Sequence, residues 1–412
     1  MYPQIRHLHY LSGMVHIKEF AVERWMDEYE DTAKFNLAET CCASVSLDDL
    51  KEFAGSKSTN IIDFSKKQIY GAIRGSEQLR QNIANLYSGG IDGDVKPSQV
   101  LVTNGAIQAN FLALYTNVGI GDHVICQYPT YQQLYSVPES FGAEVSLWRS
   151  DETKEWGLHL EELEKLVQPN TKLIILNNPQ NPTGAVLSRE TLQGIVDIAR
   201  KHSVTIHSDE VYRPLFHSAG SQTPPSILSF GYKKCYATGS MSKAFSLAGI
   251  RLGWIVSADT SIIDACASTR DYTTISVSQV DDQIATFALS LSTRENLMQR
   301  NIQLARENLT LVNAFVEKFS WACQWTRPKA GTTAFIKFFG RNGRPIRDVE
   351  FCERLIAKTG AMLVPGSRCF GGDIDFQGYV RLGYVQESQV IVDGLKVLED
   401  FMRSEYETLP TY

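Results

Sequence analysis

The chain has 412 residues, of which 43% are hydrophobic and 21% are charged, so its composition is that of a globular protein long enough for two domains. A formal net charge of -6 and the lack of a basic block argue against binding to nucleic acid. No run approaches the roughly 18 apolar residues of a membrane span, and residues 1–7 lack the apolar core of a secretory signal. We therefore expect a cytoplasmic protein with neither nucleic-acid nor membrane partners.

The first 35 residues contain one amphipathic stretch, at residues 18–29. Its apolar side chains fall near helical spacing and are Phe20, Val22, Trp25, Met26 and Tyr29. We expect this stretch to anchor a smaller domain.

From about residue 98, short apolar runs alternate with helical segments. The expected strands are residues 100–103, 123–126, 144–148, 172–176, 204–207, 234–238 and 251–256, and the expected helices are residues 106–117, 131–141 and 189–202. Such alternation implies crossover connections and an α/β fold with a mostly parallel sheet covered by helices on both faces. In sheets of this kind, ligands bind at the loops that leave the strand ends.

The pattern changes after residue 260. Long helices are expected at residues 261–290 and 294–319, followed by strands at 333–338, 361–364 and 379–383 and helices at 347–358 and 386–403. We interpret this part as a smaller α+β domain that the N-terminal segment completes. The predicted division is a large domain of residues 48–288 and a small domain of residues 1–47 and 289–412.

The eight cysteines are scattered, without a Cys-x-x-Cys pair or a nearby histidine cluster. Such usage is typical of free thiols in a reducing compartment. We expect neither a metal site nor a disulfide framework.

One stretch carries the clearest chemical signal, Ser-Met-Ser-Lys-Ala-Phe-Ser-Leu-Ala-Gly-Ile-Arg-Leu-Gly-Trp at residues 240–254. Lys243 lies among hydroxyl groups, and an amine whose pKa is lowered by burial or a nearby cation forms a Schiff base with an aldehyde. Ser240, Ser242 and Arg251 can hold the phosphate of that aldehyde, with planar bidentate hydrogen bonds from the arginine. This pattern favours pyridoxal phosphate chemistry.

Three further motifs follow expected strands. The amides at the helix start in Asn-Gly-Ala-Ile-Gln (residues 104–108) could cradle a phosphate, although a tight turn explains Gly105 equally well. Asn-Asn-Pro-Gln-Asn-Pro-Thr-Gly (residues 177–184) forces a sharp exit from a strand and exposes an amide side chain. Asp209, at the end of another strand, is costly to bury without a partner, and a protonated pyridine nitrogen is a suitable one.

These motifs, spread over roughly residues 65–385, resemble in type and order those of the fold-type I pyridoxal-phosphate-dependent class I/II aminotransferase superfamily. The resemblance implies pyridoxal 5'-phosphate as cofactor and a homodimer that acts at Cα of an L-amino acid. It implies that Lys243 forms the Schiff base and moves the Cα proton as general base. Aminotransfer is the expected reaction.

The resemblance also assigns cofactor contacts residue by residue. It places the phosphate at Gly105, Ala106 and the amide of Ile107, beside the hydroxyls and Arg251. Tyr131 in Tyr-Pro-Thr-Tyr (residues 128–131) corresponds to the aromatic residue that stacks on the cofactor ring, although a core tyrosine is an alternative interpretation.

The remaining assignments concern the ring substituents, the substrate and the second subunit. Asn181 and Tyr212 correspond to the two donors to the phenolic oxygen of the cofactor, and Asp209 to the partner of the ring nitrogen. Tyr70 corresponds to a tyrosine that reaches the phosphate in the neighbouring subunit. Arg381, in an apolar strand, corresponds to the arginine that binds the α-carboxylate of the substrate.

Two loops depart from ordinary members of the superfamily. Residues 35–46, Phe-Asn-Leu-Ala-Glu-Thr-Cys-Cys-Ala-Ser-Val-Ser, replace a Gly-x-Pro segment, and residues 270–276 are similar to a subgroup that includes capreomycidine synthase, a cyclase of arginine derivatives. Glu39 and Asp271 in these loops suggest a substrate with a basic or polar side chain, and Thr274 is a further candidate for the substrate site. Of the two interpretations, solvated surface carboxylates are the one that the sequence favours.

The same motifs also bear on three other functions. A cyclase or a β/γ-eliminating lyase would use the same residues and differs only in the fate of the carbanion. Ser240-x-x-Lys243 with Lys358-Thr-Gly360 also resembles the penicillin-recognising serine enzymes, but Tyr115-Thr-Asn117 precedes the serine and breaks their motif order. A ligand-sensing regulator would need a DNA-binding module, for which the chain has neither room nor a basic stretch.

Overall fold

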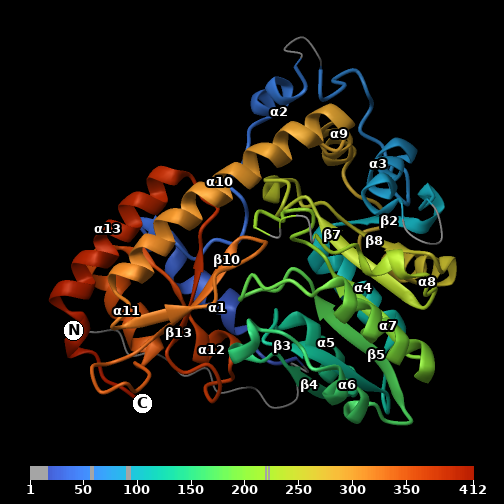
Figure 1. Ribbon diagram of the computed structural model, residues 1–412. Helices are drawn as coiled ribbons and strands as arrows, with labels where there is room; N and C mark the ends of the chain where they lie inside the picture. The colour runs from blue at the N-terminus through green and yellow to red at the C-terminus, as the bar shows by residue number, and fades with distance from the viewer. Residues whose placement is uncertain (1–16, 56–59, 90–93, 219, 221–222) are drawn as a thin grey trace.

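The computed structural model describes residues 17–55, 60–89, 94–218, 220 and 223–412. The expectation that residues 1–7 hold no secretory signal, and residues 1–16 of the predicted small domain, lie outside the described residues. Figure 1 shows a large sheet with helices on both sides, next to a smaller sheet along which the long helix α10 (Leu291–Lys318) runs.

The large sheet has seven strands in the order β2-β8-β7-β6-β5-β3-β4. Their bounds are β2 Val100–Thr103, β3 His123–Tyr128, β4 Glu144–Arg149, β5 Thr171–Asn177, β6 Thr205–Asp209, β7 Cys235–Ser240 and β8 Gly253–Ser257. Neighbouring strands from β4 to β7 pair in parallel, whereas β8 is antiparallel to both of its neighbours. The predicted mostly parallel α/β sheet is confirmed.

Both faces of this sheet are buried. Along β5, Leu173 and Ile175 belong to one apolar cluster and Ile174 to the other, because successive side chains point to opposite faces. The first cluster packs against α4 (Gly105–Asn117), α5 (Gln133–Ser140) and α8 (Thr260–Arg270), and the second against α6 (Leu160–Leu166) and α7 (Arg189–His202). Continuously apolar strands are the consequence of this double cover.

Helix α7 follows directly from its sequence. Ser188 caps its start by accepting a hydrogen bond from the amide of Thr191, and Ser203 ends it in a left-handed conformation. Its buried side chains repeat at helical spacing and are Leu192, Ile195, Val196 and Ala199. Its bounds are those predicted.

A four-stranded antiparallel sheet, in the order β12-β13-β10-β9, lies beside the large one (Figure 1). Its strands are β9 Cys323–Trp325, β10 Thr333–Phe338, β12 Val364–Pro365 and β13 Tyr379–Gly383, and β1 Phe35–Asn36 pairs in parallel with β11 Ala361–Met362. The accompanying helices are α1 Ala21–Tyr29, α11 Asp348–Thr359, α12 Gly366–Phe370 and α13 Ser388–Ser404. This is the α+β part expected from the chain ends.

Three more helices complete the described structure. Helices α2 (Leu47–Phe53), α3 (Glu77–Tyr87) and α9 (Gln279–Ala288) pack near the end of α10 that lies beside the large sheet. None of the described helices has both the length and the apolar content that crossing a membrane requires.

The expected helix at residues 261–290 was wrong. The chain instead forms α8 and α9 separated by residues 271–278, where Ile275 has φ = 59°. Ser278 begins the new helix, because its side chain accepts hydrogen bonds from the amides of Val280 and Asp281. The expected strand at 361–364 also divides, since β11 pairs with β1 and β12 with β13.

The predicted domain division stays a prediction. Its first boundary falls just inside α2, and its second lies between α9 and α10. One apolar cluster contains Leu309 of α10 as well as Ile174 of the large sheet, so the two parts share a continuous core.

Candidate active site

A cavity of about 570 Å³ opens at the carboxyl ends of the parallel strands, where the two parts of the chain meet. Its lining brings together most of the predicted site residues: Ala106, Ile107, Tyr131, Asn181, Asp209, Tyr212, Ser240, Ser242, Lys243, Arg251, Arg381 and Glu39. Strand ends and loops supply the floor, whereas α1 and the loop after β1 supply the opposite wall.

One end of the cavity is suited to an anion. Arg251 donates to Oγ of Ser242 over 3.3 Å and to the carbonyl of Ala248 over 2.9 Å, and both acceptors are uncharged. The α4 helix starts here at Gly105, which has φ = +72° and lies so close to Arg251 that a Cβ atom would be 2.9 Å from its guanidinium. A guanidinium that donates here to uncharged acceptors, beside hydroxyl groups and the positive end of a helix, fits a phosphate.

The middle of the cavity holds a buried carboxylate. Asp209 is 3% exposed, and its oxygens accept hydrogen bonds from Nδ2 of Asn110 over 3.0 Å and from the amide of Val211 over 3.2 Å. Burial raises the pKa of Asp209 to about 6, and these two hydrogen bonds offset the rise only in part. Because both donors are uncharged, the site still suits a cation such as a protonated ring nitrogen.

An uncharged histidine, His207, lies behind this carboxylate and contacts Asn110. His207 is fully buried, and its Nε2 lies 3.2 Å from Oδ1 of Asn110 and 3.2 Å from Oγ1 of Thr238. Burial lowers the pKa of His207 to about 3, so the ring carries no charge at neutral pH. His207 therefore orients Asn110 but, being uncharged, provides no cation to pair with Asp209.

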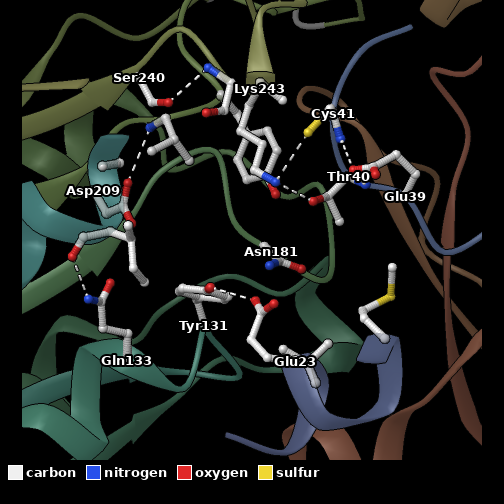
Figure 2. A pocket seen from close by; sticks show the side chains of 18 of the residues that line it. Glu23, Glu39, Thr40, Cys41, Tyr131, Gln133, Asn181, Asp209, Ser240 and Lys243 are labelled. Carbon is white, nitrogen blue, oxygen red and sulfur yellow. Dashed lines mark hydrogen bonds between the residues drawn. The ribbon is translucent and has the colours of Figure 1, made fainter. Parts of the chain in front are cut away.

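Tyr131 and Asn181 lie on the next loops around the rim. The hydroxyl of Tyr131 donates to Oε1 of Glu23 on α1 over 2.7 Å, and its ring packs 4.7 Å from that of Phe20 (Figure 2). Oδ1 of Asn181 accepts from Arg381 over 3.4 Å. Tyr131 thus lies between the large sheet and α1 rather than within the core of either.

Lys243 extends from the end of β7 into the cavity. Its Nζ atom lies 2.6 Å from Oγ1 of Thr40 and 3.6 Å from Sγ of Cys41, both on the loop after β1 (Figure 2). Burial alone lowers the pKa of Lys243, but Cys41, Tyr212 and Glu39 outweigh it and hold the pKa above the ordinary lysine value. The expected lowering of this pKa is therefore not found in the protein alone, because Cys41, Tyr212 and Glu39 together favour the charged form of the amine.

Arg381 lies on β13 at the far side of the cavity. It is 3% exposed and donates from Nη2 to the carbonyl of Ala38 over 3.0 Å, and its buried Nε atom has no hydrogen-bond partner among the described residues. A buried guanidinium with an unused donor is suited to a planar anion such as a carboxylate.

Glu39 lines the cavity, but one of its oxygens is already engaged. Oε1 accepts hydrogen bonds from the amides of Thr40 over 2.6 Å and Cys41 over 2.8 Å. Burial acts to raise the pKa of Glu39, yet the charge of Lys243 and these hydrogen bonds hold it below its ordinary value. Glu39 is therefore ionised, and its carboxylate holds the backbone of the loop at Thr40 and Cys41.

Tyr70, Thr274 and Asp271 do not line this cavity within one chain, and Gly105 lies beside it at the start of α4. Tyr70 is 74% exposed and lines a second cavity of about 260 Å³. Oγ1 of Thr274 accepts from Nε2 of Gln108 over 3.0 Å, and neither Thr274 nor Asp271 lines the main cavity.

Sequence reasoning missed several residues of the cavity. Asn110 sits in an apolar helix, where an asparagine carries no motif, and Glu23 and Met26 were assigned only to an amphipathic helix. Thr40 and Cys41 were noted within an unusual loop, but their contact with Lys243 spans more than 200 positions and leaves no local pattern.

A lysine, a buried carboxylate and an anion site at the strand ends of a mostly parallel sheet are the arrangement of a pyridoxal-phosphate-dependent enzyme. A family model described as aminotransferase class I and II matches residues 41–392. The chain belongs to this family; it is a pyridoxal-phosphate-dependent transferase, and its cofactor is pyridoxal 5'-phosphate.

Individual relatives support the same assignment. An aspartate aminotransferase of Thermotoga maritima is 31% identical over 331 residues, which are 80% of this chain and 82% of the relative. Capreomycidine synthase of Streptomyces vinaceus is 28% identical over 307 residues, 73% of either chain. The crystal structure of a pyridoxal-phosphate-dependent aminotransferase from Streptococcus suis superimposes with a TM-score of 0.85 at 38% identity, covering 94% of this chain and 98% of that one.

Proposed function

We propose that this enzyme is an aminotransferase that removes the α-amino group of an L-amino acid and delivers it to a keto acid. The observation that carries the proposal is the convergence of Lys243, Asp209 and Arg381 on one cavity. These residues supply a base, a carboxylate for the ring nitrogen and a cation for the substrate carboxylate. The aspartate aminotransferase relative at 31% identity supports this choice of reaction.

The cofactor, when bound, holds the amino acid covalently at its aldehyde carbon and withdraws electrons from the Cα–H bond. Arg251, Ser240 and Ser242, with the amides that begin α4, would bind its phosphate. Asp209 would hold the ring nitrogen protonated, since a buried carboxylate is stabilised by a paired cation.

The remaining residues act on the substrate and the ring. Arg381 would bind the α-carboxylate through its planar guanidinium, which orients Cα toward Lys243. Nζ of Lys243 would take the proton from Cα and later return it, and the atom that receives it decides the reaction. Tyr131 would cover the ring, and Asn181 and Tyr212 would donate to its phenolic oxygen.

The substrate side chain is basic in this proposal. Three carboxylates line the cavity away from the phosphate end, on Glu23, Glu30 and Glu39. Burial raises the pKa of Glu30, and the neighbouring charges of Glu39 and Glu23 raise it further, so the three carboxylates repel one another. A cationic side chain held at its other end by Arg381 would relieve that repulsion.

The assembly is proposed to be a homodimer with shared active sites, because Tyr70 is exposed on its own chain and matches a motif that serves the neighbouring site. We also propose that residues 48–288 form the cofactor domain and that the chain ends form the smaller one. A cytoplasmic location is proposed on the eight free cysteines, which suit a reducing compartment.

A second candidate is a cyclase or eliminating lyase. The capreomycidine synthase relative favours it, as does the loop after β1, which carries Thr40 and Cys41 beside Lys243. The same residues would generate the carbanion, but a substituent would leave or a ring would close before Lys243 returns the proton.

An absorbance titration of the purified holoenzyme separates the two. Single amino acids are added without any keto acid, and the cofactor spectrum and products are followed. Stable conversion of the cofactor to its amino form, reversed by a keto acid, supports the aminotransferase and names its substrate. Spontaneous return of the original spectrum with a cyclised or eliminated product supports the second candidate and overturns the first.

A further inference from the structure

The loop after β1 places one hydroxyl group directly on the amine of Lys243. We propose that Thr40 is a positioning residue for this lysine, and that its hydroxyl fixes the direction in which the free amine faces Cα. The inference rests on the proposed role of Lys243 as the base and adds a residue to it.

The contact is short and sheltered. Oγ1 of Thr40 lies 2.6 Å from Nζ of Lys243, and Thr40 is 9% exposed (Figure 2). Burial raises the pKa of Tyr212, and the charges of Lys243 and Arg381, together with the side chain of Thr40, oppose that rise, so the Thr40 hydroxyl lies near Tyr212 as well. The hydroxyl oxygen of Thr40 accepts the hydrogen bond from Nζ of Lys243.

The backbone of the loop is fixed from several sides. The amide of Thr40 donates to Oε1 of Glu39 over 2.6 Å, and its carbonyl accepts from Oγ1 of Thr332 over 2.7 Å. The amide of Cys42 donates to the carbonyl of Lys243 over 3.2 Å, which ties the loop to the lysine segment itself. A hydroxyl held on such a support can orient a flexible lysine with little loss of freedom on contact.

The chemistry requires such an orientation. In the proton transfer the Cα–H bond breaks, its electron pair stays with the substrate, and a new N–H bond forms at Nζ of Lys243. A free amine has one lone pair, and by accepting one of the amine's hydrogens Thr40 turns that lone pair away from itself. Thr40 neither gains nor loses a proton, so its contribution is geometric.

The neighbouring thiol is a poorer candidate for this role. Sγ of Cys41 lies 3.6 Å from Nζ, and burial raises the pKa of Cys41 to about 11, so it stays a weakly hydrogen-bonding thiol at neutral pH. The titratable groups around Nζ are Cys41 and Glu39 on the loop, Asp209 and Tyr212 at the end of β6, and Arg381 on β13. The Thr40 side chain also acts on the pKa of Tyr212, whereas Glu39 is bound by the backbone amide of Thr40, which Thr40→Val retains.

The first test compares Thr40→Val, which keeps the shape but removes the hydroxyl, with Thr40→Ser, which restores it. Exchange of the substrate Cα proton with D2O is measured in the holoenzyme, since it reports the Lys243 step in either candidate reaction. We expect Thr40→Val to slow exchange by roughly 2- to 10-fold, the range for a hydrogen bond between uncharged groups, with KM nearly unchanged. Thr40→Ser should recover most of the rate.

The second test needs no cofactor. In cofactor-free protein, the rate at which an amine-directed acylating reagent modifies Lys243 is followed against pH by peptide mass spectrometry. Removing an acceptor from the ammonium form should lower the apparent pKa of Lys243 by about one unit in Thr40→Val and leave it unchanged in Thr40→Ser. Thermal unfolding of the three proteins shows whether Thr40→Val has kept the fold.

The outcomes separate the inference from the function it rests on. Exchange and lysine reactivity in a folded Thr40→Val protein equal to those of the wild type would overturn the role of Thr40 while leaving the proposed function intact. A uniform rise in KM that Thr40→Ser does not rescue would also overturn it, because that is the effect of a structural residue. Absence of Cα exchange in the wild-type holoenzyme with every amino acid would overturn the proposed function itself.

Discussion

Nδ2 of Asn110 lies 3.0 Å from Oδ2 of Asp209 and donates the one side-chain hydrogen bond that this buried carboxylate receives among the described residues. Asn110 is itself held, because its Oδ1 accepts from the hydroxyl of Thr238 over 2.6 Å and lies near His207. The arrangement keeps Asp209 in place with uncharged donors, and the charge of Lys243 offsets the effect of burial on this carboxylate only in part. Without its cofactor, the enzyme therefore carries a destabilising carboxylate in its core.

This carboxylate should make the cofactor-free protein less stable as the pH rises. The pKa of Asp209 is raised to about 6 from an ordinary value near 3.8, so the native state binds the proton more tightly than the unfolded state. The stabilisation that this proton gives the native state is complete below about pH 4 and is lost as the pH rises through 6. The free energy of unfolding falls by about 3 kcal/mol at most over this range.

The variant Asp209→Asn tests this. Thermal unfolding of cofactor-free protein should give equal Tm values for wild type and variant near pH 4 and a higher Tm for the variant above pH 6. Asp197→Asn, at an exposed position of α7, is the control and should show no such trend. A difference in Tm between the wild type and Asp209→Asn that is the same at every pH would contradict the prediction. With cofactor present, the order at neutral pH should reverse.

Arg381→Lys should raise KM for every amino acid that the enzyme accepts. Lysine retains the charge but lacks the planar pair of donors, and it would leave the carbonyl of Ala38 without its present partner. We expect a rise in KM of about 10- to 100-fold with a smaller change in kcat, measured by steady-state kinetics. An unchanged KM would show that the α-carboxylate binds elsewhere.

Glu23 and Glu30, on the same side of the cavity as α1, should determine how strongly the enzyme prefers a positively charged substrate side chain. Arginine and citrulline have nearly the same shape but differ in charge, so their kcat/KM ratio isolates the effect. Glu23→Gln combined with Glu30→Gln should lower the ratio by roughly 5-fold per carboxylate, a modest effect because both are partly solvated. Glu28→Gln, on α1 but outside the cavity lining, is the matched control. A ratio that does not change would assign these carboxylates to the solvated surface.

Subunit complementation tests the shared active site. If Tyr70 serves the neighbouring chain, a hybrid dimer of Tyr70→Ala and Lys243→Ala chains has one site with both residues intact. Refolding an equal mixture of the two inactive variants should restore about a quarter of the wild-type activity, because half of the dimers are hybrids with one working site of two. No recovery, with hybrid formation verified by mass spectrometry, would contradict the shared site.

The sequence by itself determined the large sheet and the residues at its edge. Runs such as residues 173–176 are apolar throughout because both faces of β5 are covered. Asp209 and Lys243 stand out because each lies at or just after a predicted strand, within a short, distinctive motif. Helix α7 was predicted to the residue because its cap, its apolar spacing and its end signal all lie within the segment.

The tertiary structure decided what depends on distant contacts. The division between α8 and α9 rests on a turn at residues 271–278 that interrupts an otherwise helical pattern, and its Thr274 meets Gln108 on α4. The wall that faces the cofactor site, with Glu23, Thr40 and Cys41, comes from segments more than 100 positions away from the residues they contact. Packing of the whole chain brings these side chains to Tyr131 and Lys243, and no local pattern encodes a contact of that kind.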